Sequence, residues 1–346
     1  MNLYSKIVKN KSCYIIAEIS ANHNGNKDVA LETIHAAKRA GANAVKIQTY
    51  KPETITLDVK NDDFLIKGDT IWDGKYLFDL YAEAFTPWEW TADLFKEAKK
   101  LGIECFSSPF DFTAVDFLEQ FDPPAYKIAS FEITDIPLIK KVASLGKMII
   151  ISTGVADFKA IELAVDTCRS VGNEQIILLK CTSAYPARIE DANLYMINKF
   201  TNDFDVVAGL SDHTLGHTVP VVSVALGAKV IEKHIILNKE IGGPDAAFSL
   251  DEQEFKFMVD SVRSAEKSFG KIAYNNNVNS QFARSLYISK DVKKGDLVSH
   301  ENIQSVRPSF GLHPINYEIV INNYCFVDNY KKGTRLSWDC VQSFFK

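Results

Sequence analysis

The chain has 346 residues, of which 46% are hydrophobic and 24% charged, a composition that indicates a globular protein and excludes a disordered one. Its formal net charge of -5 argues against nonspecific binding to nucleic acid or to anionic membranes, so an anionic ligand would need a local basic cluster. No apolar run approaches the ~20 residues of a membrane span, residues 1–12 lack a signal-peptide core, and the six cysteines form no CxxC pair, so we expect a cytoplasmic protein with reduced thiols.

Eight short apolar runs alternate with longer amphipathic segments. They lie at 14–19, 44–48, 104–107, 125–128, 148–152, 176–180, 206–210 and 230–234. Such runs are typical of parallel strands that are buried on both faces. Eight strand–helix repeats within residues 1–270 predict an α/β fold, the (β/α)8 TIM barrel. A doubly wound open sheet is the alternative, but no glycine-rich dinucleotide motif follows the first strand.

Two segments carry the signals of connecting helices. Between the first two strands, apolar residues recur at helical spacing at Ala30, Ile34 and Ala37. Asn26 or Asp28 can cap the start of this helix, and Gly41 can end it. Further along, residues 86–89 have the pattern of a capping box with proline at the first helical position, and residues 90–101 continue with one apolar face.

Two stretches interrupt the regular alternation. Residues 51–85 form a polar and aromatic insertion after the second strand, on the face where barrel active sites lie, so they are either a lid or a surface excursion. Residues 271–282 predict a linker. Residues 283–346 contain short β-rich pieces with turns at 293–296 and 331–333, which predict a separate small domain.

Two histidines stand at the ends of neighbouring strands. His213 follows the seventh strand and His234 ends the eighth, so both imidazoles can reach one divalent metal ion. Two protein ligands leave positions open for water and substrate, which suits a metal ion that acts as a Lewis acid. His23 and His217 are competing candidates, although positions in loops or in support of the site fit them better. The alternative for each histidine is a purely structural role.

Basic and hydroxyl side chains end or follow several other strands. Lys46 and Lys127 stand inside apolar runs, where a buried ammonium requires an anionic partner such as phosphate or carboxylate. Hydroxyl groups that can donate to the same anion follow the fifth, sixth and seventh strands, at Ser152, Ser183 and Ser211. Thr153-Gly154 allows close approach of the backbone. Ordinary turn positions are the alternative for the serines.

A carboxylate ends the first strand. Glu18 could move a proton or orient a water or hydroxyl group, or it could form a salt bridge with a lysine of the barrel. Other polar side chains expected near the same rim are Gln48, Glu132, Tyr185 and Asp245. Because the carboxyl ends of the strands converge in a barrel, all these groups are predicted to share one mouth.

Seven segments that contain these residues form a specific set of motifs. They are 16–25 (IAEISANHNG), 45–50 (VKIQTY), 105–110 (CFSSPF), 126–132 (YKIASFE), 209–214 (GLSDHT), 232–234 (EKH) and 243–245 (GPD). Together they resemble the sialic acid synthase family, most closely its pseudaminic acid synthase branch, over nearly the whole chain. The resemblance implies a TIM barrel followed by a small C-terminal antifreeze-like (SAF) β-rich domain.

The resemblance also implies an activity. Such a transferase condenses phosphoenolpyruvate with an amino-sugar aldehyde and water to give a nine-carbon 2-keto acid and phosphate, with C–O cleavage. Mn²⁺ or Mg²⁺ on His213 and His234 would polarise the aldehyde, and Glu18 would carry out the proton transfers. The residues implied to bind phosphoenolpyruvate are Lys46, Lys127, Ser130, Ser152, Ser183 and Ser211. Those implied to face the sugar are Gln48, Glu132, Tyr185 and Asp245. The sialic acid branch often has asparagine at the position of Ser183.

The C-terminal segment carries the branch assignment. In this family an arginine of the antifreeze-like domain reaches the barrel of the partner subunit, and Arg307, within 305–314 (SVRPSFGLHP), occupies that position. It would bind the N-acyl carbonyl of the substrate in a homodimer. This segment, with 66–72 and 86–90, resembles pseudaminic acid synthases, whose sugar is 2,4-diacetamido-2,4,6-trideoxy-L-altrose. The alternatives are an N-acetylneuraminic or legionaminic acid synthase with the same chemistry, or a noncatalytic carbohydrate-binding protein.

Overall fold

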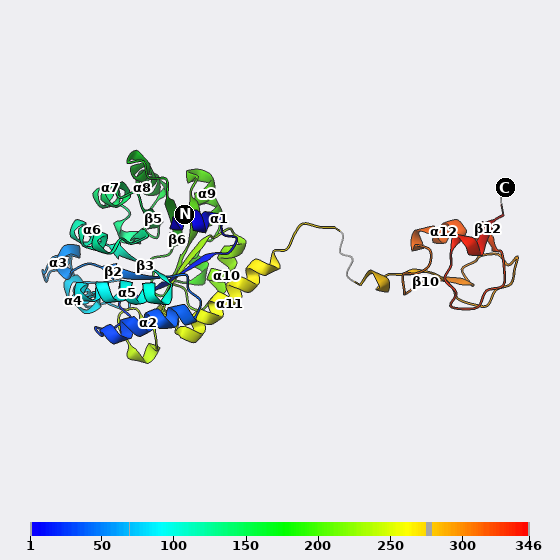
Figure 1. Cartoon of the computed structure of the whole chain (residues 1–346), viewed down its shortest axis with the longest axis horizontal. Helices are drawn as coiled ribbons and strands as arrows, with labels where there is room; N and C mark the ends of the chain where they lie inside the picture. Colours follow the sequence, from blue (N-terminus) through cyan, green and yellow to red (C-terminus); the bar gives the residue numbers. More distant parts are fainter. Residues whose placement is uncertain (1, 69, 275–278, 345–346) are drawn as a thin grey trace. The chain divides into compact units, whose positions relative to one another are not determined.

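The computed structural model describes residues 2–68, 70–274 and 279–344 (Figure 1). The chain forms two compact units, residues 1–270 and 271–346. Part of the predicted linker, residues 275–278, lies outside the described residues. Within the described ranges, no helix has both the length and the apolar character needed to cross a membrane.

Eight parallel strands close into a barrel in chain order, as predicted. They are β1 (Tyr14–Glu18), β2 (Ala44–Thr49), β3 (Glu104–Pro109), β4 (Ala125–Ile128), β5 (Met148–Ser152), β6 (Ile176–Cys181), β7 (Val207–Asp212) and β8 (Val230–His234). The barrel is closed because β1 pairs with both β2 and β8, with Glu18 opposite Lys46 on one side and His234 on the other. The open-sheet alternative is therefore wrong.

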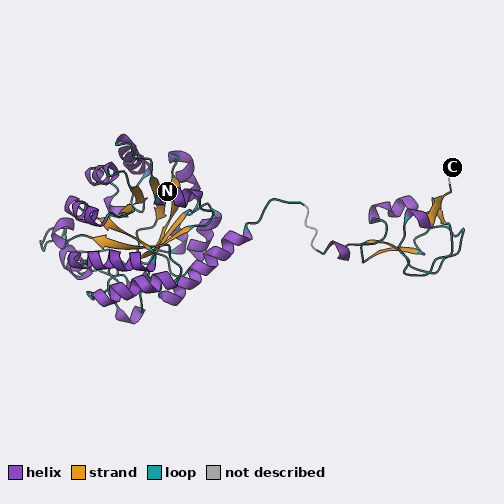
Figure 2. Ribbon diagram, viewed as in Figure 1, coloured by secondary structure: helices purple, strands orange, loops and turns teal. Residues whose placement is uncertain are grey.

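Helices surround the strands of the barrel (Figure 2). They are α2 (Lys27–Arg39), α5 (Thr91–Leu101), α6 (Phe112–Leu118), α7 (Ile136–Ser144), α8 (Phe158–Ser170), α9 (Met196–Phe204), α10 (Thr218–Ala225) and α11 (Glu252–Ser268). Their apolar faces pack on outward-facing strand residues such as Ile15, Val45 and Ile149. Asn26 caps α2 through its side chain, as predicted, by accepting hydrogen bonds from two backbone N–H groups.

The capping box expected at residues 86–89 is wrong. A 3-10 turn, η1 (Trp88–Trp90), comes first, and α5 begins at Thr91 without a side-chain cap. Thr86 is buried, and its hydroxyl lies 3.1 Å from Nε2 of His23. A buried imidazole needs a hydrogen-bond partner, and Thr86 provides it instead of capping the helix. The predicted end is correct, because Gly102 follows α5 in the left-handed conformation.

The interior of the barrel changes character along its axis. At the amino-terminal end of the strands the inward side chains are apolar, for example Ile16, Phe106 and Met148. Helix α1 (Leu3–Lys9) covers this end and adds its own apolar side chains Leu3 and Ile7. Because side chains alternate between the two faces of a strand, the inward positions nearer the carboxyl ends are Glu18, Lys46, Lys127, Ser152 and Glu232.

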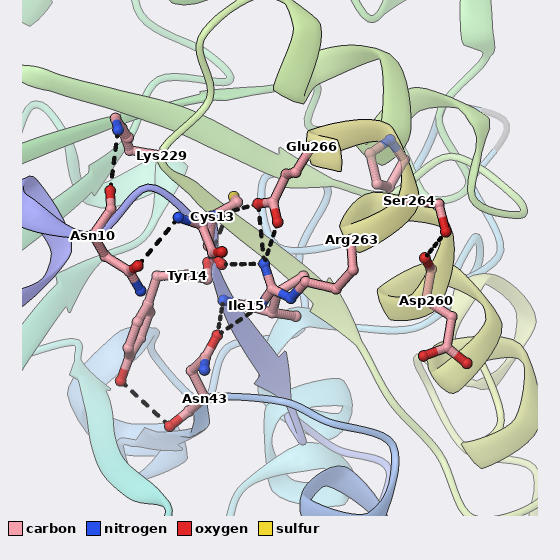
Figure 3. Close-up of polar contacts among 12 residues, drawn as sticks. Asn10, Cys13, Tyr14, Ile15, Asn43, Lys229, Asp260, Arg263, Ser264 and Glu266 are labelled. Atoms are coloured by element: carbon pink, nitrogen blue, oxygen red, sulfur yellow. Dashed lines mark hydrogen bonds and ion pairs between the residues drawn. The ribbon is translucent and has the colours of Figure 1, made fainter. Parts of the chain in front are cut away.

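Polar contacts join the last helix of the barrel to the first strand (Figure 3). Arg263 on α11 donates to the Cys13 carbonyl at 2.8 Å and to Glu266 at 3.0 Å. Glu266 in turn accepts a hydrogen bond from the Cys13 backbone N–H at 2.5 Å. The Asn43 side-chain oxygen accepts from the backbone N–H of Ile15 at 2.8 Å. These contacts hold β1 in place and so fix the position of Glu18 at its other end.

The insertion after β2 folds into a structure of its own. It contains α3 (Pro52–Ile55) and α4 (Leu77–Ala84). An antiparallel bridge joins Leu65 to Tyr76, and the backbone N–H of Ile66 donates to the Lys75 carbonyl at 2.9 Å. The insertion is therefore a folded element attached to the carboxyl-terminal mouth of the barrel.

The second unit is small and β-rich, in agreement with the sequence prediction. One antiparallel pair is β9 (Ser285–Ile288) with β10 (Ile303–Val306), and the other is β11 (Tyr324–Phe326) with β12 (Val341–Ser343). A short helix, α12 (Tyr317–Val320), precedes the second pair. The unit has its own apolar core, which includes Leu286, Ile288, Val298, Phe326 and Leu336.

Candidate active site

Two lysines and two glutamates form a buried ionic cluster inside the barrel. Lys46 Nζ lies 3.1 Å from Glu18 Oε2 and 3.1 Å from Glu232 Oε1, and it donates to Ser108 Oγ at 3.3 Å. Lys127 Nζ lies 3.7 Å from the same Glu232 oxygen. The four charged groups come from β1, β2, β4 and β8, which only a closed barrel brings together.

The environment gives the four groups different pKa values. Burial disfavours the charge on Lys46, but Glu18 and Glu232 outweigh it and raise the lysine pKa. Burial lowers the pKa of Lys127, and the nearby Glu232 carboxylate counteracts only part of this decrease. Burial raises the pKa of Glu18 to about 7 against the opposing effect of Lys46. The pKa of Glu232 is lowered, because Lys127 and Lys46 outweigh its burial. Two lysines thus share the carboxylate of Glu232, which makes this part of the barrel a candidate site for an anionic ligand.

Glu232 is the site residue that the sequence analysis missed. Its signal was present in the alternation of β8, because Glu232 stands two positions before His234 and must point to the same side of the strand. A carboxylate inside an apolar strand requires partners, and the two lysines provide them. The sequence predicted an external anion or a salt bridge with Glu18 for the lysines, and Glu232 is a further internal partner.

The predicted serines lie near this cluster, at the carboxyl ends of the strands. Ser211 Oγ donates to Glu232 at 3.3 Å, and Ser130 Oγ accepts from the Gly154 backbone N–H at 3.1 Å. Among the described residues, the buried Oγ atoms of Ser152 and Ser183 have no hydrogen-bond partner. A Cβ atom on Gly154 would lie 2.1 Å from Ser183 Oγ, so a larger residue there would have to displace this hydroxyl group. Ser130, Ser152 and Ser211 line the cavity described below, whereas Ser183 packs beside Gly154 and does not line it.

The two histidines of the prediction lie side by side. The ring centroids of His213 and His234 are 5.2 Å apart. His213 Nδ1 is 3.0 Å from the Thr182 carbonyl, which is closer than the Cys181 sulfur at 3.9 Å, so we place the proton there and leave Nε2 as an acceptor. His234 Nδ1 is buried without a hydrogen-bond partner in the described part of the chain, and burial lowers the pKa of this imidazole well below 6.5.

These two imidazoles fit a divalent metal ion. Metal ligation needs a free lone pair on each ring, and Nε2 of His213 and the unpartnered Nδ1 of His234 are the nitrogens that can offer one. In the part of the chain that the structure describes, no group of three or more His, Cys, Asp or Glu side chains forms a closed metal site. A metal ion held here would keep open positions, as expected for a catalytic rather than a structural ion.

A second buried ion pair supports the two histidines from outside the barrel. Asp212 and Lys233 alternate with the site residues and point toward the helices, where their charged atoms are 2.5 Å apart. Asp212 also accepts a hydrogen bond from the backbone N–H of Thr214 at 3.1 Å. This pair ties the end of β7 to the end of β8 and thereby holds His213 beside His234.

The competing histidines lie elsewhere. His23 has both ring nitrogens occupied, since Nε2 contacts Thr86 and Nδ1 accepts from the Gly25 backbone N–H at 3.1 Å. His217 precedes α10 and packs edge-on against Phe257. Neither side chain lines the cavity of the site.

Four further polar side chains surround the cluster, as expected: Gln48, Glu132, Tyr185 and Asp245. Gln48 Nε2 donates to Glu18 Oε1 at 2.9 Å. The ring of Tyr185 lies 4.5 Å from the ring of His213, between centroids. Both predictions for Glu18 therefore have a structural basis, since it pairs with Lys46 and also lines the cavity.

The other two members of this group are acids. Asp245 accepts a hydrogen bond from Ser20 Oγ and lies 3.7 Å from His234 Nδ1, too far for a hydrogen bond. Burial raises the pKa of Glu132 to about 7, with Lys127 opposing. Its Oε2 atom is buried and has no hydrogen-bond partner among the described residues. Both carboxyl groups can accept hydrogen bonds from a polyhydroxyl ligand.

One cavity of about 350 Å³ is lined by the buried ionic cluster, by His213 and His234, by the four further polar side chains, and by Ser130, Ser152 and Ser211. The insertion, residues 51–85, lines it through Ile55, Ile66, Thr70, Trp72, Leu77, Leu80, Tyr81 and Ala84. Trp72 Nε1 donates to the Pro244 carbonyl at 3.1 Å, and its ring lies 5.3 Å from that of Tyr185. The insertion therefore covers the site and is not merely a surface excursion.

Arg307 belongs to the second unit. It follows β10 directly, and its side chain is exposed. The role expected for it in a partner subunit stays a prediction.

Comparison with known proteins places the chain in a family. Residues 33–274 match the NeuB family, and residues 283–342 match the SAF domain. The chain therefore belongs to the NeuB family, and its resemblance to the sialic acid synthases is confirmed.

Individual relatives are similar over most of the chain. It is 50% identical over 312 residues to the pseudaminic acid synthase of Campylobacter jejuni subsp. jejuni serotype O:2, which covers 89% of this chain and 91% of that one. The pseudaminic acid synthase of Helicobacter pylori is 46% identical, with coverage of 89% and 92%. Among solved structures, the N-acetylneuraminic acid synthetase of Leptospira borgpetersenii serovar Hardjo-bovis, in complex with citrate, is 30% identical, with a TM-score of 0.69 and coverage of 78% and 89%.

Proposed function

We propose that the protein is a pseudaminic acid synthase. It would condense phosphoenolpyruvate with 2,4-diacetamido-2,4,6-trideoxy-L-altrose and water to give pseudaminic acid and phosphate. The observation that carries the proposal is that Lys46, Lys127 and the two imidazoles of His213 and His234 face a single cavity, in a chain whose relatives include pseudaminic acid synthases. The cytoplasm, where phosphoenolpyruvate is available, is the expected compartment.

Phosphoenolpyruvate would bind at the bottom of the cavity. Its phosphate and carboxylate require positive charge, which Lys46 and Lys127 supply in a buried setting. Hydroxyl groups complete the site at Ser130, Ser152, Ser183 and Ser211. The unpartnered Oγ atoms of Ser152 and Ser183 are donors that an anion would satisfy.

The sugar aldehyde would lie beside the histidines. A divalent metal ion, Mn²⁺ or Mg²⁺, held by His213 and His234 would polarise the aldehyde oxygen toward attack by C3 of phosphoenolpyruvate. Gln48, Glu132, Tyr185 and Asp245 would position the hydroxyl and acetamido groups of the sugar.

Glu18 would manage the protons of the reaction. The new C–C bond joins C3 of phosphoenolpyruvate to the aldehyde carbon, whose oxygen takes up a proton. Water adds at C2 and gives up a proton, and the C2–O bond to phosphate then breaks. A carboxyl group with a pKa of about 7, held by Gln48 and Lys46, can both accept and return a proton near neutral pH.

The test of this function is product formation. Purified protein with Mn²⁺, phosphoenolpyruvate and the diacetamido-trideoxy-altrose should release phosphate and give a nine-carbon acid identifiable by mass spectrometry and NMR. N-acetylmannosamine and the legionaminic acid precursor are the comparison substrates. Turnover of N-acetylmannosamine alone would contradict the branch assignment, and sugar binding without phosphate release would support a noncatalytic protein instead.

Arg307 would complete the site of a partner subunit in a homodimer, by binding an N-acyl carbonyl of the sugar. We expect Arg307→Ala to lose most of its activity, and mixing it with inactive His213→Ala protein to restore part of it, because each subunit supplies what the other lacks. Activity of the mixed dimers should be compared with that of each variant alone. Absence of any restoration would contradict a role across the interface.

A further inference from the structure

The cavity has two chemically different walls. The wall made by the strand ends is polar and charged, as described above. The opposite wall is made mainly by the insertion and presents the aliphatic side chains Ile55, Ile66, Leu77 and Leu80. Phe131, which follows β4, extends this apolar surface to the mouth of the cavity and is 61% exposed.

The apolar wall is fixed in its position over the site. Leu77 and Leu80 lie on α4, and the backbone N–H of Leu77 donates to the Phe64 carbonyl at 2.9 Å. At the far side, Trp72 bridges the insertion to Pro244 and Tyr185, in the loops that follow β8 and β6. The wall is therefore a fixed part of the cavity and not a loop that moves freely over it.

We propose that this apolar wall binds the C6 methyl group of the sugar and selects 6-deoxy hexoses over their 6-hydroxy counterparts. The inference rests on the proposed function, because it takes the aldehyde carbon, C1, to lie beside His213 and His234. C6 is at the opposite end of the six-carbon chain, and we place it against the insertion, which follows β2 and lines the same cavity. A methyl group matches aliphatic side chains, whereas a hydroxyl group would lose its water there.

Apart from the Tyr81 hydroxyl, the wall offers little to replace that water. The hydroxyl of Thr70, which lines the same part of the cavity, already donates to Asp73 at 2.8 Å. A buried hydroxyl without a partner is destabilising, and an apolar pocket discriminates against an added hydroxyl by about 10²-fold. We therefore expect a preference for the 6-deoxy sugar of about 10- to 100-fold in kcat/KM.

The experiment compares one pair of substrates in three proteins. The substrates are 2,4-diacetamido-2,4,6-trideoxy-L-altrose and its analogue with a hydroxyl group at C6. The proteins are the wild type, Leu77→Asn, and Leu57→Asn as the matched control, since Leu57 belongs to the same insertion but is 61% exposed and does not line the cavity. The measured quantity is the ratio of kcat/KM for the two sugars, which partial loss of active protein does not alter.

The ratio should favour the 6-deoxy sugar in the wild type and in Leu57→Asn. It should fall at least about 5-fold in Leu77→Asn, because the new amide can form one hydrogen bond with the C6 hydroxyl group. If Leu77→Asn does not fold, Ile66→Thr makes the same comparison. The inference would be overturned if the wild type had equal kcat/KM for both sugars, or if the ratio fell as much in Leu57→Asn as in Leu77→Asn. Either result would leave the proposed function intact.

A third sugar shows whether the wall binds the C6 methyl group or a methyl group of the acetamido substituents. The N-formyl analogue of the 6-deoxy sugar lacks only the methyl groups of its acyl substituents. If Leu77→Asn changes selectivity between acetyl and formyl substrates but not between the C6 pair, the wall binds an acyl methyl and the inference is wrong. Turnover of none of these sugars would remove the proposed function and this inference with it.

Discussion

The two ends of the barrel interior show how one set of strands can serve two purposes. Near the amino-terminal end, inward residues such as Ile16, Phe106 and Met148 are fully buried and pack under helix α1. Near the other end, inward residues of the same sheet are Lys46, Lys127 and Glu18, which are equally buried but charged. The lower half contributes stability through apolar burial, and the upper half keeps charges that are costly to bury.

The comparison teaches that burial alone does not distinguish core from site. Lys127 is 2% exposed and Met148 is 1% exposed, although they stand on adjacent strands of the same barrel. The difference lies in what each group contacts, because a buried charge is tolerated only with a partner. Changes in the upper half should therefore affect catalysis first, and changes in the lower half should affect stability alone.

The largest expected effect comes from the histidine pair. We expect His234→Ala to lower kcat by about 10³-fold, because several kcal/mol of charge stabilisation at the aldehyde oxygen would be lost. His217→Ala, which removes an imidazole outside the cavity, is the control and should retain activity. Metal content of both proteins should be measured alongside turnover. Full turnover of the wild type in chelator would exclude the metal role.

Lys46→Met should affect both catalysis and stability. It leaves Glu232 beside only one lysine, and breaking a buried pair in this way typically costs about 3–5 kcal/mol. KM for phosphoenolpyruvate should rise at least about 10-fold, as expected for a lost charged contact. Adding Glu232→Gln should restore much of the free energy of unfolding, measured by denaturant titration, but not the affinity for phosphoenolpyruvate. Recovery of both would show that Lys46 is structural.

Ile7→Ala tests the lower half directly. Removing this side chain of α1, which is 2% exposed, should lower the free energy of unfolding by about 2–5 kcal/mol and leave both KM values unchanged. Val8→Ala on the exposed side of the same helix is the control. A changed KM for phosphoenolpyruvate in Ile7→Ala would break the proposed separation between the two halves.

The smallest effect concerns Glu132 and pH. Its pKa is raised to about 7 in the folded protein, so between its usual value and pH 7 the folded state binds more protons than the unfolded state, and stability falls as pH rises. Glu132→Gln should therefore be more stable than the wild type above pH 7, by on the order of 3 kcal/mol, and the difference should disappear near pH 4.5.

Thermal unfolding across this pH range checks that prediction. Glu162→Gln, the same change at an exposed position of α8, is its control. A pH-independent difference between Glu132→Gln and the wild type would show that the acid ionises freely in the folded state.

Much of this architecture could be predicted from the sequence because it follows from local patterns. Eight apolar runs specify buried parallel strands, and the polar residue at the end of each run marks the mouth of the barrel. His213, His234, Lys46 and Lys127 were found in this way, and the structure brings all four to one cavity.

The parts that escaped prediction depend on contacts between distant segments. Thr86 has the sequence context of a helix cap, but its hydroxyl is used by His23, 63 residues away. Glu232 sits inside a strand, and nothing local says that it balances Lys46 across the barrel. Trp72 looked like any aromatic residue of a loop, because its carbonyl partner lies 172 residues further on.

Helix α1 has one further consequence for how ligands come and go. Because it packs over the amino-terminal end of the barrel with Leu3 and Ile7, ligands have to reach the site from the other end. A molecule held by the lysines at the bottom has to enter before one that sits higher up, and it has to leave after it. If the proposed function holds, phosphoenolpyruvate would therefore bind before the sugar.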